Sequence, residues 1–210
     1  MEGVITAIEA VKTSTRTVNI HLDSGQAFRI TKEAVLQAGL RTGLTLTDDQ
    51  VRDLLNRDAL ERTYVRALHF LSYRPRSESE VRCYLARRAT PSEILHSIVE
   101  RLKREGLIDD DAFARFWVEN RSTFSPRGQR LLRQELRSKG LASSVIEENL
   151  PQDEEESAYA AAAKRARALA QADWETFCRK LFPFLQRRGF SYDVAKGAVA
   201  RLWKESRPPA

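Results

Sequence analysis

Apolar and polar side chains alternate in the first thirty residues. Val18, Ile20 and Leu22 are separated by single polar residues, and the alternation resumes after an Asp-Ser-Gly segment. A period of two residues is typical of strands with one buried face, and Asp, Ser and Gly favour tight turns. The pattern therefore predicts a β-hairpin over residues 17–30.

Hydrophobic residues close to the N-terminus predict a third strand. Residues 4–8 read Val-Ile-Thr-Ala-Ile, and a two-stranded ribbon without further strands is barely stable in water. A short helix is expected near 32–37, before Gly39 and Gly43. Residues 1–45 are accordingly predicted to form a small β-rich module.

From Thr47 onward the apolar residues recur every three or four positions, which is the period of amphipathic helices. Capping boxes, in which Ser or Thr is followed three residues later by Glu or Gln, begin at Thr47, Ser77 and Thr90. Pro126 after Ser125 is expected at the first position of a further helix, where its missing amide hydrogen has no cost. Glycines that mark helix ends are Gly106, Gly140 and Gly189.

An internal repeat organises the helical part of the chain. Leu85, Leu136 and Leu185 are each followed three residues later by Arg or Lys, then by Ala or Gly, and nine residues later by Ile or Val. Each copy is expected to form three helices. The predicted helices span 59–72, 78–88 and 91–105 in the first copy, 110–122, 127–139 and 142–149 in the second, and 153–171, 174–188 and 192–204 in the third.

These patterns predict a mainly α protein, an elongated, curved tandem array of three three-helix, helix-turn-helix-like repeats with a small β-rich N-terminal module. A three-helix unit of about fifty residues has a thin core, so neighbouring repeats should stack to cover their apolar faces. The expected domains are the module at 1–45, a linker helix with repeat 1 at 46–108, repeat 2 at 109–150 and repeat 3 at 151–207.

Residues that could support catalysis, a cofactor or a metal ion are sparse. The chain has none of the glycine-rich nucleotide loops, nucleophile elbows or paired metal-binding histidines of common enzymes. The three histidines are scattered, and the acidic runs at 109–111 and 153–156 fall at predicted helix N-termini, where carboxylates complement the helix dipole. We therefore expect a protein that is not an enzyme and that uses no metal and no cofactor.

The two cysteines, Cys83 and Cys178, have no Cys-x-x-Cys spacing and no neighbouring His pair. They are expected to be reduced and buried. No apolar stretch approaches the roughly 18 residues of a membrane span, and the N-terminus lacks the pattern of a secretory signal. These features favour a cytoplasmic protein without a membrane partner.

The charge balance favours a polyanionic partner. The chain has 35 Lys and Arg against 29 Asp and Glu, a formal net charge of +6 and an isoelectric point near 9.5. The positive excess lies in 51–108 and 151–210, whereas 109–150 carries equal numbers of both signs. Within the two positive regions the basic residues concentrate at Arg74, Arg76, Arg87, Arg88, Lys103, Arg104, Arg179, Lys180, Arg187 and Arg188.

Arginines recur every three or four residues in the second copy, at Arg127, Arg130, Arg133 and Arg137. This spacing would stack them along one helix face, with their acidic partners elsewhere, and such a face suits a phosphate backbone or an acidic protein groove. A solvated helix face is the alternative explanation. Because a three-helix unit also resembles a helix-turn-helix, a sequence-specific DNA-binding regulator is a second functional hypothesis, and a scaffold for other proteins is a third.

Three motifs follow one another along the chain. They are Ser72–Val81 (SYRPRSESEV), Gly106–Asp110 (GLIDD) with Phe113, Ala114, Phe116, Trp117 and Arg121 after it, and Leu132–Leu136 (LRQEL) with Lys139, Gly140 and Leu141 after it. This set, which covers about residues 57–205, resembles the first repeat, the repeat junction and the second-repeat helix of the RecX family, the regulatory proteins of the RecA recombinase. The first 45 residues look like an extension that many members lack or vary, and the turn at 126–128 only approximates the family pattern.

The resemblance implies a non-enzymatic modulator that binds RecA–DNA filaments in their helical groove. Family members inhibit ATP hydrolysis, strand exchange and co-protease activity of RecA, and so temper homologous recombination, DNA repair and the SOS response. We expect this chain to be a monomer with weak, sequence-independent contacts to DNA. The candidate filament-binding residues are Arg74, Arg76, Arg87, Arg88, Lys103, Arg104, Arg127, Arg130, Arg133, Arg137, Lys139, Arg187 and Arg188.

Overall fold

The structure is a computed structural model that describes residues 1–12 and 15–206. It consists of two compact units, the first made of residues 1–73 and 84–101 and the second of 74–83 and the described residues from 102 onward. Each unit has hydrophobic core clusters of its own. Residue 207, where the third repeat is expected to end, lies outside the described residues.

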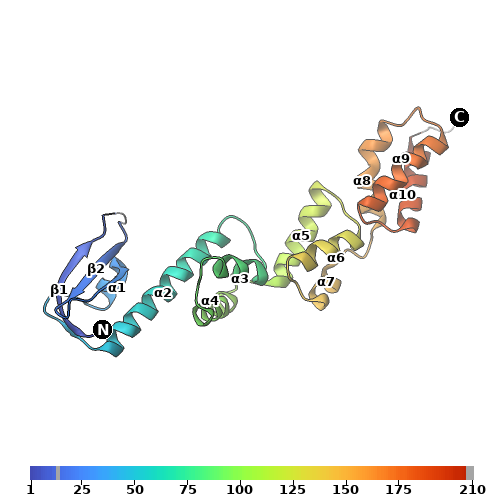
Figure 1. Ribbon diagram of the computed structural model, residues 1–210. Coiled ribbons are helices and arrows are strands. Elements are labelled where there is room, and N and C mark those ends of the chain that lie inside the picture. Colours follow the sequence, from blue (N-terminus) through green and yellow to red (C-terminus); the bar gives the residue numbers. More distant parts are fainter. Residues whose placement is uncertain (13–14, 207–210) are drawn as a thin grey trace. The chain divides into compact units, whose positions relative to one another are not determined.

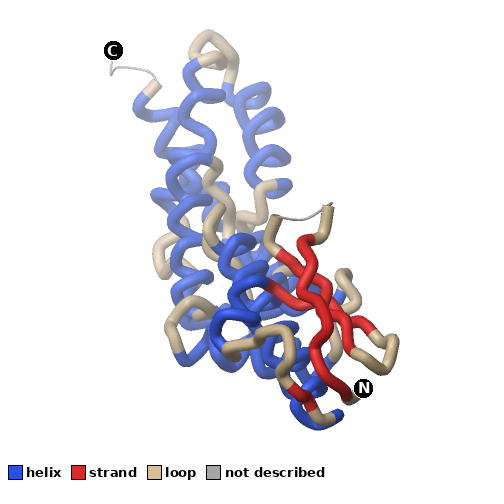
Figure 2. The backbone as a smooth tube through the Cα atoms, turned by 90° about the vertical axis from the view of Figure 1, so that its left-hand side faces the viewer, coloured by secondary structure: helices blue, strands red, loops and turns tan. Residues whose placement is uncertain are grey.

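The first unit begins with a four-stranded antiparallel sheet, whose strands lie in the order β3-β2-β1-β4 (Figures 1 and 2). The strands are β1 (Gly3–Ala10), β2 (Thr17–Leu22), β3 (Ala27–Thr31) and β4 (Thr45–Leu46). The predicted hairpin and the third strand are confirmed. The two-residue β4 was not predicted, because so short a strand has no recognisable alternation.

One face of the sheet is apolar and carries the core of this module. Val18, Ile20 and Leu22 are buried, while the residues between them are only partly covered. The sheet packs against α1 (Lys32–Gln37) and the first half of α2 (Asp48–Leu71). Thr47 and Gln50 form the predicted capping box at the start of α2.

A buried carboxylate fixes α2 to the end of β3. Asp58 Oδ1 accepts hydrogen bonds from the backbone N–H and the hydroxyl of Thr31 at 2.8 and 2.6 Å. Arg62 one turn later lies with its Nε 3.0 Å from Asp58 Oδ2. Because the charge has both a cation and two hydrogen-bond donors, its burial is tolerated.

The remaining helices follow the predicted three-helix pattern. They are α3 (Glu78–Ala86), α4 (Ser92–Arg104), α5 (Asp110–Phe124), α6 (Gln129–Ser138), α7 (Ser143–Asn149), α8 (Glu155–Arg167), α9 (Trp174–Arg187) and α10 (Tyr192–Glu205) (Figure 1). A mainly helical chain with a small N-terminal antiparallel sheet is thus confirmed.

The internal repeat is visible in the backbone itself. Leu85, Leu136 and Leu185 are all completely buried. The residue four positions after each leucine has a left-handed conformation, with φ of 53° at Ala89, 81° at Gly140 and 91° at Gly189. The second helix of every repeat therefore ends by the same turn, as helices closed by a left-handed residue do.

The predicted start of α6 is wrong. Pro126 lies outside the helix, which begins at Gln129 with Gly128 as its N-cap. The Gly128 N–H donates to the Arg188 carbonyl at 2.9 Å, and a Cβ at Gly128 would overlap the backbone of Gly189. This close backbone approach requires a glycine at the N-cap and sets the helix start, whereas local sequence favours the Ser-Pro pair.

The expectation that both cysteines are buried is also wrong. Cys83 is exposed, and Cys178 is partly buried. The buried positions of α3 are Val81 and Leu85, one turn apart. Cys83 lies midway between them in sequence and therefore on the opposite side of the helix.

Substitutions at two of the left-handed positions should change the free energy of unfolding in opposite directions. Gly140→Ala should destabilise its unit by about 2 kcal/mol or more, because the left-handed backbone strains any Cβ and that Cβ would also collide with Ser79. Ala89→Gly should stabilise by about 0.5–1 kcal/mol, since it relieves the same strain. Urea unfolding followed by circular dichroism measures both; destabilisation by Ala89→Gly would contradict the shared turn.

Candidate functional site

Two junctions in the second unit join the second helices of successive repeats by the same contact. The N-cap residue of the earlier helix donates a hydrogen bond to the carbonyl of the basic residue that ends the later helix. Ser77 Oγ donates to the Lys139 carbonyl at 2.7 Å, and Gly128 N–H donates to the Arg188 carbonyl at 2.9 Å. Ser77 and Gly128 each precede a buried repeat leucine by eight residues, so the junction is itself a repeated structure.

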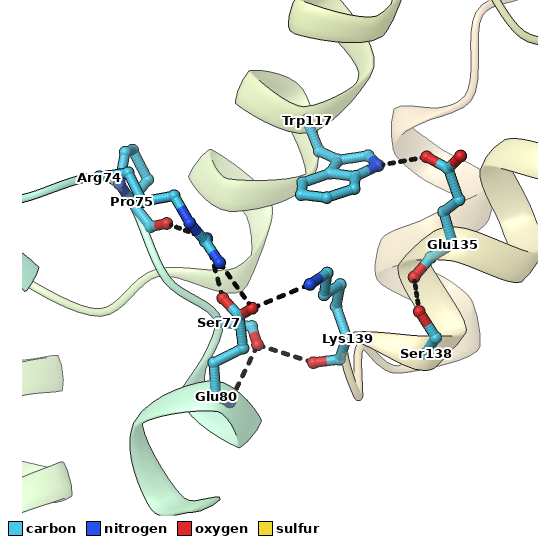
Figure 3. A network of polar contacts seen from close by, with 8 residues as sticks. All are labelled: Arg74, Pro75, Ser77, Glu80, Trp117, Glu135, Ser138 and Lys139. Atoms are coloured by element: carbon cyan, nitrogen blue, oxygen red, sulfur yellow. Dashed lines mark hydrogen bonds and ion pairs between the residues drawn. The ribbon is translucent and has the colours of Figure 1, made fainter. Parts of the chain in front are cut away.

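A partly buried ion cluster completes the first of these junctions (Figure 3). The Glu80 carboxylate accepts two hydrogen bonds from Arg74, at 2.8 and 3.0 Å, and one from Lys139 Nζ at 3.0 Å. The Glu80 side chain is only 17% exposed. Burial raises the pKa of Glu80, but the hydrogen bonds from Arg74 and Lys139 outweigh it, so its pKa is lowered.

A second carboxylate, Glu135 of α6, gathers groups from α5. It accepts hydrogen bonds from Trp117 Nε1 at 2.8 Å and from Arg121 Nε at 2.7 Å. The Lys139 ammonium lies 5.0 Å from the centre of the Trp117 ring, a cation–π contact that links the two carboxylates. Figure 3 shows Trp117 and Lys139 between Glu80 on one side and Glu135 on the other.

The acidic runs act at helix N-termini, as predicted, and they also act on remote helices. Asp109 caps its own helix by accepting from the amides of 111 and 112, while Asp110 accepts from the Glu78 amide at the start of α3 at 2.9 Å. In the same way Glu154 accepts from the Gln129 amide at the start of α6 at 2.5 Å. Each run therefore supplies a carboxylate acceptor to the first backbone amide of the second helix in the preceding repeat.

Many of the predicted filament-binding residues are engaged inside the chain. Arg74 and Lys139 bind Glu80, and the other contacts pair Lys103 with Glu78 (3.1 Å), Arg127 with Glu135 (3.5 Å), Arg133 with Glu147 (2.7 Å), Arg130 with the Gln186 carbonyl (2.9 Å), Arg188 with the Pro126 carbonyl (3.1 Å) and Arg88 with the Tyr84 carbonyl (3.1 Å). Arg76 is half-buried, and burial lowers its pKa.

The predicted single face of four arginines is wrong for two reasons. Arg127 precedes the helix, because α6 begins only at Gln129. The acidic partners are also close at hand, since Arg133 makes a two-bond pair with Glu147 on the next helix. Only Arg137 of the four is exposed and makes no hydrogen bond or ion pair through its side chain among the residues described.

Four predicted residues remain exposed without an ion pair or side-chain hydrogen bond in the part of the chain that the structure describes. They are Arg87, Arg104, Arg137 and Arg187. Three of them, Arg87, Arg137 and Arg187, lie within two residues of the repeat leucines. Every repeat therefore presents one unneutralised arginine at the end of its second helix.

The described residues contain no group of three or more His, Cys, Asp or Glu side chains that could hold a metal ion. Among those same residues, no helix is long and apolar enough to cross a bilayer.

Comparisons with known proteins assign these repeats. Sequence profiles of the first, second and third three-helix domains of RecX match residues 64–102, 109–150 and 153–199, which together exceed half of the chain. The chain belongs to the RecX family. The resemblance carried by the three motifs is thereby confirmed.

Individual RecX proteins are similar over most of the chain. The regulatory protein RecX of Bacillus subtilis is 30% identical over 206 residues, which are 96% of this chain and 78% of the relative. That of Halalkalibacterium halodurans is 35% identical over 69% of this chain and 56% of its own length. A crystal structure of regulatory protein RecX superposes with a TM-score of 0.66 at 30% identity, covering 93% of this chain and 98% of the other. Since the Bacillus match covers 96% of this chain, it takes in part of the β-rich module.

The Glu80 cluster gives a prediction for stability against pH. Glu80→Gln should destabilise the second unit by about 1–3 kcal/mol at neutral pH, because Arg74 and Lys139 lose a shared charged acceptor. Since the folded pKa of Glu80 lies below its ordinary value of 4.5, its contribution is present above that value and is lost as pH falls through the folded pKa. The variant should therefore lose less stability than the wild type on acidification.

Urea unfolding followed by tryptophan fluorescence at neutral and acidic pH measures this, since all three tryptophans lie in the second unit. Glu147→Gln is the matched control, because that carboxylate also binds an arginine but is 52% exposed, and its effect should be smaller. Equal effects of the two substitutions would show that the Glu80 cluster does not hold the junction.

Proposed function

We propose that this RecX-family chain is a non-enzymatic inhibitor of a RecA recombinase, which binds the RecA–DNA filament and suppresses its ATP hydrolysis, strand exchange and co-protease activity. Its partners are the RecA filament and, through weak sequence-independent contacts, DNA. It acts as a monomer in the bacterial cytoplasm. The name of its relatives, regulatory protein RecX, supports a regulatory role.

The observation that carries this proposal is the exposed arginine at the end of the second helix in every repeat. Arg87, Arg137 and Arg187 make no ion pair among the residues described, although the chain neutralises many of its other cations internally. A series of single cations at repeated intervals matches a polymeric partner, because each contact is weak and the contacts reinforce one another. A filament of identical subunits on DNA is such a polymer.

The proposed inhibition can be tested on the rate of ATP hydrolysis by the cognate RecA. Added chain should lower single-strand-stimulated ATP hydrolysis by RecA in proportion to filament occupancy, and the effect should weaken as salt rises, because cations mediate it. A coupled ATPase assay measures the rate. Unchanged hydrolysis on filaments shown by co-sedimentation to be saturated with the chain would contradict inhibition.

The exposed arginines can be tested as a group. The triple variant Arg87→Gln, Arg137→Gln, Arg187→Gln should require about tenfold more protein for half-inhibition, if removal of each charge costs about 0.5 kcal/mol. The matched control Arg52→Gln, Arg57→Gln, Arg66→Gln removes the same charge from α2, where Arg52 and Arg57 pair with neighbouring aspartates. Equal loss in both variants would mean that net charge alone, and not these positions, governs inhibition.

A further inference from the structure

The third repeat contains a hollow whose charged lining is entirely basic. It lies between the C-terminal part of α8 and one face of α9, and its volume is about 590 Å³. The charged residues that line it are Arg165, Arg179, Lys180 and Arg187. The other residues that line it are Ala168, Leu169 and Pro183.

The helical period explains why these side chains of α9 face the hollow. Phe177, Leu181 and Leu185 are buried and fix the inner face of this helix. Arg179, Lys180 and Arg187 are exposed, so they project on the outer side, where Arg165 reaches them from α8. Cations from two helices therefore converge on one concave surface.

None of these four cations is neutralised within the described part of the chain. Arg179 donates only to the Thr176 hydroxyl, at a long 3.4 Å, and the Arg165 guanidinium lies 4.7 Å from the centre of the Phe184 ring. No ion pair to an acid is formed by any of the four. The cations of the first junction differ, because Arg74 and Lys139 each have a carboxylate oxygen within 3.0 Å.

The positive charge extends beyond the hollow. The Arg188 guanidinium also lies near Phe184, 4.8 Å from the centre of the ring. Burial lowers the pKa of Arg188, and the nearby charges of Arg127 and Arg165 lower it further. Gathering like charges without counter-charges is unfavourable for the isolated chain, and a bound polyanion removes that cost.

We propose that this hollow binds the phosphate backbone of a single DNA strand. The inference deepens the proposed function, on which it rests, since it assigns the DNA contact to the third repeat. A concave surface lined by cations follows one backbone through its phosphates and tolerates any sequence. A duplex carries two backbones separated by grooves about 6–12 Å wide, which suit a protruding helix better than a hollow.

The test compares two full-length variants with the wild type. The hollow variant is Arg165→Gln, Arg179→Gln, Lys180→Gln, Arg187→Gln. The control variant is Lys32→Gln, Arg41→Gln, Arg52→Gln, Arg66→Gln, which removes the same charge from the first unit. Fluorescence anisotropy of a labelled oligo-dT strand, without RecA, measures affinity over a range of salt concentrations. Circular dichroism checks folding, and Lys180→Gln with Arg187→Gln replaces the fourfold variant if that one unfolds.

The hollow variant should bind the strand about tenfold more weakly or worse, and its salt dependence should fall by about 0.7 in log–log slope for each phosphate that is no longer neutralised. The control should lose less than about threefold. Equal affinities of the two variants would overturn the proposal. A wild type that binds a duplex of the same length as tightly as the strand would overturn the assignment to single-stranded DNA.

RecA ATPase assays with the same proteins separate this inference from the proposed function. A hollow variant that loses DNA affinity supports the inference, whether or not it still inhibits RecA. If the wild type binds the strand through the hollow but leaves ATP hydrolysis by RecA unchanged, the proposed function is contradicted and the inference is supported. A hollow variant that keeps full DNA affinity but loses inhibition overturns the inference, because the hollow would then meet an acidic protein surface.

Discussion

The helical repeats of the second unit depend on one kind of hydrogen bond. In it, the N-cap of one repeat's second helix donates to the carbonyl at the end of the second helix in the next repeat. That carbonyl is left without an intrahelical partner, and the left-handed residue after it turns the chain away. The donor is a hydroxyl at Ser77 and a backbone amide at Gly128. One geometric solution is thus reached with two different chemical groups.

This constraint divides the basic residues into two classes. Lys139 and Arg188 return their side chains to the junctions that their own carbonyls help to form, and the Arg74 guanidinium joins Lys139 on Glu80. These side chains hold the repeats together: Arg74 and Lys139 are paired with the Glu80 carboxylate, and Arg188 donates to the Pro126 carbonyl. The arginines just beyond the repeat leucines are exposed instead, and one of them, Arg187, lines the α8–α9 hollow with three further cations. Function is therefore expected where neutralisation is missing, not where arginine is most frequent.

The repeat could be predicted from the sequence because residues close together in the chain determine its helix ends. Leu85, Leu136 and Leu185 and the glycine or alanine after each are sufficient to locate three similar turns. Capping residues such as Thr47 and Asp109 gave helix starts for the same reason. The Pro126 prediction was wrong because the start of α6 is decided by a backbone contact to residues 188–189, about sixty positions away.

The distribution of contacts among the cations could not be predicted in this way. Glu80 and Lys139 are 59 residues apart in sequence, and no local pattern shows that they meet. The place of Arg165 in the hollow could not be predicted, because the hollow is formed together with residues of a second helix, α9. Charge counting located the basic regions but could not separate paired from unpaired side chains.

Hydrogen–deuterium exchange of the full chain, with and without assembled RecA–DNA filaments, tests the central claim most directly. The claim is that unneutralised cations meet the filament while the junction cations hold the repeats together. It predicts slower exchange at the ends of α3, α6 and α9 when filaments are in excess, and little change at the already protected amides of the Glu80 and Glu135 junction. Unchanged exchange at all three helix ends, under conditions where the chain co-sediments with filaments, would contradict it.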